Sequence, residues 1–164
     1  MNKVLVRTEG IRLPSLAIAA KIIIKKALKI MGKKNWEVSV FFCGNDYIRN
    51  LNRQYRNKDE PTDVLTFSQD SDRDRFPEGT LNGTGKGWLK LKAAHFTAGD
   101  IVISIDALAE NTRFFNVSAD EELRRLLVHG ILHLAGYDHA SNKTEEPMLK
   151  TQEEILARLA EKTS

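Results

Sequence analysis

The segment HGILHLAGYDH, which runs from His129 to His139, contains three of the four histidines in this chain of 164 residues. His129 and His133 are four residues apart, so on a helix their side chains project from one face, with Cβ atoms about 6 Å apart. Two imidazoles at this spacing can bind one metal ion between them. Gly136 can adopt a positive φ without a steric clash, which lets the chain turn and bring His139 back as a third ligand. The segment therefore predicts a metal site with three histidine ligands.

The number of ligands indicates a catalytic site. Three neutral imidazoles around zinc leave a fourth coordination position open, whereas structural zinc is usually closed by four protein ligands. Zinc in an open site can polarise a substrate oxygen or activate water. The alternative interpretation, that the histidines are ordinary helix and loop residues, suits one histidine better than three at this spacing. Imidazole sites also bind nickel, copper and iron, and availability decides among these metals.

A similar spacing of histidines occurs in zinc metalloproteases of the metzincin type. Those proteases carry a glutamate directly after the first histidine, where it acts as the general base. Here that position is Gly130, which cannot accept a proton. A peptidase is therefore a weaker alternative, because its main acid–base group would be missing.

Apolar periodicity extends the prediction to the rest of the chain. Ser118 to Glu121 form a capping box that opens the histidine helix, and Gly136 is expected to end it. Other helices are predicted over 14–31, 47–55, 107–115 and 145–159, and strands over 3–7, 36–42, 64–67 and 101–105.

These elements predict an α+β fold. We expect a single layered domain over residues 1–164, with a small mixed four-stranded sheet packed by about five helices. The metal site would lie on a helix and the turn that follows it. Residues 69–97 are rich in glycine and do not match the pattern, so we interpret them as a long surface insertion.

The composition is that of a soluble globular protein, with 41% hydrophobic and 29% charged residues. No stretch approaches the roughly 18 uninterrupted apolar residues of a membrane helix. The one cysteine, Cys43, cannot form an internal disulfide, which favours a reducing compartment. We therefore expect a cytoplasmic protein with no membrane partner.

Charge is distributed unevenly, although the net charge is only +3. Residues 1–60 contain 13 Lys and Arg against 5 Asp and Glu, whereas residues 61–164 contain 12 against 17. Lys21, Lys25 and Lys29 form a row at helical spacing within the basic part. Such a surface either binds a polyanion or is a solvated helix face, and charge alone favours neither.

Three segments together resemble one known family. The histidine segment is similar to the H-G-x-L-H-L-x-G-Y-D-H signature of the YbeY family, which comprises bacterial metal-dependent endoribonucleases of ribosomal RNA maturation. Residues 51–59 (LNRQYRNKD) with 62–67 (TDVLTF), and residues 99–104 (GDIVIS), resemble two further motifs of that family. Thr66 replaces the usual serine, Ala98 replaces the usual leucine, and the 69–97 segment is longer than the usual connection.

The resemblance implies roles for individual residues. It makes His129, His133 and His139 the ligands of one zinc ion per chain, and it makes Arg56 the catalytic arginine. The chemistry of Arg56 agrees, because a guanidinium is always charged and binds phosphate oxygens in a bidentate manner. The alternative for Arg56 is a surface cation that stabilises the end of a helix.

The resemblance also implies a function. We expect a single-strand-specific endoribonuclease that acts on the 3′ end of small-subunit ribosomal RNA and in ribosome quality control. Its implied partners are single-stranded and ribosomal RNA, the small ribosomal subunit and an assembly GTPase. A second alternative is a non-enzymatic assembly factor with structural zinc, which is disfavoured because Cys43 is distant in the sequence and no fourth thiolate or imidazole stands nearby.

RNA binding is expected from basic residues of the first part of the chain, since contacts to phosphates supply affinity without sequence readout. These residues are Lys21, Lys25, Lys29, Arg53 and Lys58.

No single carboxylate is identified as the general base. Asp138 can either orient an imidazole from outside the metal shell or cap the turn, and the cap is slightly favoured. Asp63 and Asp100 are weaker candidates. His95, in the insertion, is expected at the surface.

Overall fold

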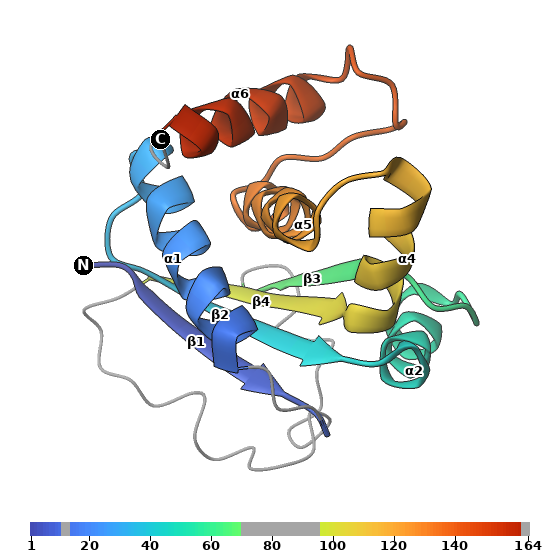
Figure 1. The fold of residues 1–164 in the computed structure, drawn as a ribbon. Helices are drawn as coiled ribbons and strands as arrows, with labels where there is room; N and C mark the ends of the chain where they lie inside the picture. Colours follow the sequence, from blue (N-terminus) through green and yellow to red (C-terminus); the bar gives the residue numbers. More distant parts are fainter. Residues whose placement is uncertain (11–13, 70–95, 162–164) are drawn as a thin grey trace.

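The computed structural model of the protein describes residues 1–10, 14–69 and 96–161. Within these residues the chain forms four strands and five helices (Figure 1). The strands are β1 (Lys3–Thr8), β2 (Trp36–Cys43), β3 (Val64–Ser68) and β4 (Phe96–Ser104). The helices are α1 (Pro14–Ile30), α2 (Asn45–Arg56), α4 (Ile105–Phe115), α5 (Ala119–Leu134) and α6 (Pro147–Glu161). None of the described helices is both long enough and apolar enough to cross a bilayer.

The strands form one mixed sheet in the order β1-β2-β4-β3. β1 pairs with β2 and β2 pairs with β4 in parallel, whereas β3 pairs with β4 in antiparallel orientation. The predicted α+β fold with a small mixed four-stranded sheet and about five helices is confirmed. Because β3 lies at one edge of the sheet, its outer side is open to groups from both faces.

Side chains alternate between the two faces of the sheet, and each face has its own core. Val38, Val40 and Phe42 of β2 belong to a large cluster with residues of α1, α5 and α6, which cover one face (Figure 1). Cys43 belongs to a smaller cluster with Ile48 and other residues of α2, which packs on the opposite face. The histidine helix α5 lies in the larger layer.

The predicted element ends are correct to within a few residues, apart from the start of β4. β4 begins at Phe96, so the last two residues assigned to the insertion belong to a strand. Ile105 begins α4 instead of ending the strand, because the Ser104 side chain accepts a hydrogen bond from the Ala107 backbone and caps the helix. Residues 70–95 of the predicted insertion, including His95, lie outside the described residues.

The signals that open and close the helices act as predicted. Ser118 and Glu121 form both hydrogen bonds of a capping box at the start of α5. Gly32 follows α1 with a φ of 70°, the left-handed conformation that ends many helices. These local interactions determine where α5 begins and therefore which turn of the helix carries each histidine.

Gly130 allows α5 to lie directly on the sheet. A Cβ atom at this position would lie 2.9 Å from two side-chain carbons of Ile101 on β4. Carbon atoms pack best about 3.5–4.0 Å apart, so no larger residue fits without a shift. Ile101 is fully buried and has little room to move. The glycine after the first histidine therefore sets the distance between α5 and the sheet.

We expect Gly130→Ala to destabilise the protein by about 1–2 kcal/mol, because overpacking costs about 1–3 kcal/mol and exceeds the helix propensity gained over glycine. Urea unfolding of the variant measures this loss. In an Ile101→Val background, which removes one of the clashing carbons, the loss should be smaller. An increase in stability on Gly130→Ala would show that α5 does not rest on Ile101.

Candidate metal centre

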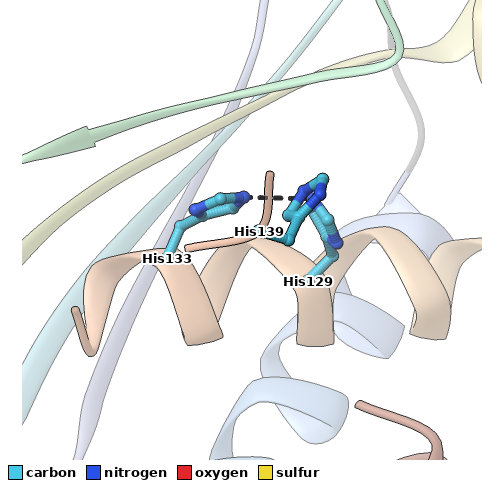
Figure 2. A group of neighbouring side chains, drawn as sticks. All are labelled: His129, His133 and His139. Atoms are coloured by element: carbon cyan, nitrogen blue, oxygen red, sulfur yellow. Dashed lines mark hydrogen bonds between the residues drawn. The ribbon is translucent and has the colours of Figure 1, made fainter. Parts of the chain in front are cut away.

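His129 and His133 project from one face of α5, one turn apart. Their Nε2 atoms lie 3.1 Å from each other, and their ring centroids are 4.7 Å apart. Figure 2 shows both rings rising from the helix toward a common point, joined there by the ring of His139. The i, i+4 spacing therefore places both side chains on one face of the helix, as predicted, and directs a nitrogen lone pair of each ring toward the same point.

The turn after α5 brings His139 to the same point. Gly136 has a φ of 93°, and the backbone N–H groups of Gly136 and Tyr137 donate to the carbonyl oxygens of His133 and Leu132. This pair of hydrogen bonds is a Schellman motif, which ends the helix and reverses the chain. The ring of His139 then lies 5.1 Å from that of His129 and 5.4 Å from that of His133, measured between centroids.

The second ring nitrogens of two histidines have their own partners. His129 Nδ1 donates to the side-chain oxygen of Gln152, at 2.8 Å, and His139 Nδ1 donates to the backbone oxygen of Ser141, at 2.9 Å. Both acceptors hold the proton on Nδ1, which leaves Nε2 free of a proton to bind a metal. Gln152 lies on α6 and is 4% exposed. Sequence reasoning missed it, because one glutamine 23 residues from its partner gives no local signal.

Burial favours the neutral form of His129 and His133. It is the largest cause that lowers the pKa of His129 and of His133 below the ordinary histidine value. For His129 the hydrogen bond to Gln152 acts in the opposite direction, while the charge of His139 lowers the pKa further. A lowered pKa means that the rings are unprotonated at neutral pH, the state in which an imidazole binds a metal.

The donor set fits a metal ion such as zinc. The ligand atoms of the three histidines all lie within 4.8 Å of one another, and among the described residues no cysteine, aspartate or glutamate joins the group. Two nitrogens about 2.0–2.1 Å from a tetrahedral zinc lie about 3.3 Å from each other. The 3.1 Å between the Nε2 atoms of His129 and His133 is close to that value. Three imidazoles with no fourth side chain match an open site.

Arg56 reaches this group from the other face of the sheet. It is the last residue of α2, and Asn57 follows with a φ of 56°. The guanidinium lies 5.8 Å from the ring centroid of Phe67, and its Nη2 donates to the backbone oxygen of Thr66 at 2.9 Å. Both partners belong to edge strand β3. Arg56 is thus held beside the edge of the sheet. A residue packed beneath a central strand could not approach the histidines in this way, because the neighbouring strands would lie between them.

One pocket joins Arg56 to the histidines. It has a volume of about 470 Å³, within the range of small-molecule sites. Its described lining comes from α2, β3, the end of α5 and the turn that follows: Arg56, Val64, Leu65, Thr66, Ser68, His129, His133, Gly136, Tyr137 and Asp138. The arginine and the metal-binding group, predicted from segments more than 70 residues apart, therefore face the same space.

An ion-pair network around the buried Glu122 holds α5 beside the start of β3. Glu122 is 1% exposed and accepts hydrogen bonds from Arg125 and from Asn111 of α4. Arg125 and Asn111 also donate to Asp63, at 3.5 and 3.1 Å. Asp63, a weaker candidate for the base, is therefore engaged in fixing the helix, although its charge also raises the pKa of His129.

Other predicted residues lie outside the pocket lining. Lys21, Lys25 and Lys29 are exposed on α1, which packs against β1, α5 and α6, and Arg53 and Lys58 are exposed at the end of α2. Their proposed role in RNA binding stays a prediction.

The remaining acidic candidates and the cysteine have structural partners. The carboxylate of Asp138 lines the pocket and accepts from the backbone N–H of His139, as a turn cap does. Asp100 accepts from Ser39 and pairs with Phe67, which places it on the face covered by α2 and away from the histidines. Cys43 is buried on that same face, where burial raises its pKa to about 12, and it is not part of the histidine group.

A model of the family described as endoribonuclease YbeY matches residues 7–160. The chain belongs to the YbeY family. The endoribonuclease YbeY of Treponema denticola is 48% identical over 133 residues, which is 81% of this chain and 77% of that protein. The YbeY of Limosilactobacillus fermentum is 42% identical over 150 residues, or 91% of this chain and 90% of that protein. The resemblance inferred from the three motifs is confirmed.

The fold of this YbeY chain also matches a solved structure. A Thermotoga maritima protein determined in solution superposes with a TM-score of 0.59 at 28% sequence identity, covering 97% of this chain and 90% of that one. The match supports the α+β architecture on which the pocket is built.

We expect Gln152→Leu to weaken zinc binding by about 10- to 100-fold, because His129 Nδ1 loses the acceptor that orients its ring. Competition with a chromogenic chelator measures the zinc dissociation constant. Gln152→Glu retains an acceptor and should retain most of the affinity. Glu153→Ala is the matched control, since Glu153 is the exposed neighbour on α6. Equal zinc affinity of Gln152→Leu and the wild type would contradict the role of Gln152.

Proposed function

We propose that the protein is a zinc-dependent endoribonuclease that cleaves single-stranded RNA. Its relatives bear the name endoribonuclease YbeY. The observation that carries the proposal is the shared pocket of about 470 Å³, which Arg56 lines together with His129 and His133, two of the three convergent imidazoles. A metal cation and an arginine on either side of one cleft are suited to a substrate with negative charge on its reacting group.

The histidines and Arg56 would have different roles in the cleavage of a phosphodiester. His129, His133 and His139 would hold zinc, which when bound polarises a phosphate oxygen or activates water. Arg56 uses one N–H to bind Thr66, and its other donors can bind the phosphate oxygens, where charge increases in the transition state. Because the backbone of β3 holds Arg56 in place, little reorganisation is needed when substrate binds.

The geometry favours this reaction over the two alternatives. A peptidase of the metzincin type needs a glutamate after the first histidine, and here Gly130 lies against Ile101 with no space for a side chain. A purely structural zinc site would be closed, whereas His129 and His133 line the pocket. Both observations support an open site without a neighbouring carboxylate.

The biological setting follows from the family. We propose cytoplasmic action in ribosomal RNA maturation, at the 3′ end of the small-subunit RNA, and in ribosome quality control. The small ribosomal subunit and an assembly GTPase are the partners that the resemblance implies. The basic residues of α1 and α2 would bind flanking phosphates, and this contribution should weaken as salt is raised.

We expect the zinc-loaded protein to cleave a labelled single-stranded RNA and to leave casein intact. Arg56→Ala should lower the cleavage rate by about 10²–10³-fold, the usual effect of losing a preorganised donor. Its zinc content should stay equal to that of the wild type, since Arg56 is not a ligand. Gel-based cleavage assays and elemental analysis of the same samples measure both quantities.

Two variants complete this experiment. His133→Ala should lose both zinc and cleavage, and Arg158→Ala, an exposed arginine on α6, should retain both. Full cleavage by Arg56→Ala would remove Arg56 from the reaction. Full cleavage by zinc-free His133→Ala would contradict the metal-dependent mechanism as a whole.

A further inference from the structure

Two adjacent aromatic residues at the end of α4 are exposed to solvent. Phe114 is 83% exposed and Phe115 is 53% exposed, and their rings meet edge to face with centroids 5.0 Å apart. The buried side of α4 is formed by Leu108, so neither phenylalanine is needed for the core. Two neighbouring large apolar side chains in water are unfavourable unless a ligand covers them, which makes the pair a candidate binding surface.

The aromatic pair is connected to the surroundings of the histidine pocket through Arg125. The guanidinium of Arg125 lies 5.7 Å from the ring centroid of Phe115, and its Nη2 lies 3.5 Å from Asp63. The residue after Asp63 is Val64, which lines the pocket. Arg125 also precedes His129 by four residues on α5, a rise of about 6 Å. Arg125 therefore links the aromatic pair to the side of the pocket on which His129 and Val64 lie.

This arrangement suits a nucleic acid strand that passes through the pocket. A strand whose phosphate is bound in the pocket continues beyond it, and a base farther along that strand is the group that would meet Phe115. Exposed aromatic rings that stack on bases are a common means of binding single strands. The edge-to-face arrangement leaves a face of one ring open to such a base.

The charges around the pair are mixed, so stacking on bases, and not a net attraction of phosphates, would have to hold the strand there. Asp120 is paired with Arg124, and Glu121 is engaged in the capping box of α5. Asp63 and Glu122 are both bonded to Arg125. Arg113, next to Phe114 in the chain, is exposed and adds a positive charge. Glu110, one turn before Phe114, is also exposed, so the three arginines of this surface stand among five carboxylates, and the contact with a base has to come from the rings.

We propose that Phe114 and Phe115 form a stacking platform for unpaired bases of the RNA strand whose phosphate lies in the histidine pocket. The proposal rests on the proposed function, and it adds a binding subsite that reads an unpaired base by its aromatic face. Such a platform would favour single strands over duplexes, because the adjacent base pairs of a duplex cover both faces of each internal base.

The test compares two strands of equal charge. Fluorescence anisotropy measures binding of an uncleaved 2′-O-methyl oligoadenylate of about 12 nucleotides, and of an abasic strand of the same length. The wild type should bind the oligoadenylate about 10-fold more tightly than the abasic strand, as expected for a base–aromatic contact. The double variant Phe114→Ala with Phe115→Ala should bind the two strands equally.

Control variants separate stacking from folding. Phe114→Trp should keep the preference for bases, and the mostly exposed Phe114 can be changed singly to serine without touching the core. Ile22→Ala, at an exposed apolar residue of α1, should behave as the wild type. Zinc content and the melting temperature of each variant should equal those of the wild type.

The outcomes distinguish the platform from the proposed function. If the wild type cleaves single-stranded RNA but binds both strands equally, or if the double variant keeps the preference, the platform is wrong and the nuclease stands. If the wild type neither binds nor cleaves RNA, both proposals are wrong.

Discussion

Gly130 packs directly against the side chain of Ile101. This contact fixes the positions of His129 and His133, which lie on the same helix on either side of the glycine. A helix held farther from β4 would carry His129 and His133 away from β3 and from Arg56. The constraint also excludes the carboxylate that a metalloprotease places at this position. The close packing of α5 on β4 thus determines where the histidine group lies. It also explains why no glutamate follows the first histidine to act as a general base.

The pocket forms where the two layers of the protein meet around an edge strand. α5 supplies histidines from one face of the sheet, and α2 supplies Arg56 from the other. Only an edge strand lets groups from both faces approach one space, since a central strand is covered on both sides by its neighbours. β3 is also short, with 5 residues, and its backbone oxygen at Thr66 holds the guanidinium. The grouping of Arg56 with the histidines therefore depends on strand order as much as on the histidine segment.

Local signals in the sequence predicted more of this structure than long-range ones. The capping box, the glycine ends of α1 and α5 and the i, i+4 histidines each involve residues a few positions apart, and all were confirmed. Gln152 was missed, because its contact with His129 depends on how α6 packs on α5. The lysine row on α1 shows what local patterns cannot predict. Periodicity indicates that Lys21, Lys25 and Lys29 share one face of the helix, but it does not indicate which molecule, if any, binds to that face. The catalytic role expected of Arg56 came from the family resemblance alone. The sequence by itself also allows a simpler explanation, in which an arginine at a helix end stabilises that end electrostatically.

The central claim is that three imidazoles bind one metal ion and leave a coordination position open. X-ray absorption at the zinc edge, combined with elemental analysis of the purified protein, tests it most directly. We expect one zinc per chain, three histidine nitrogens at about 2.0–2.1 Å and a further light ligand from solvent. A sulfur ligand at about 2.3 Å, or fewer than three histidines in the shell, would contradict the site and the chemistry inferred from it.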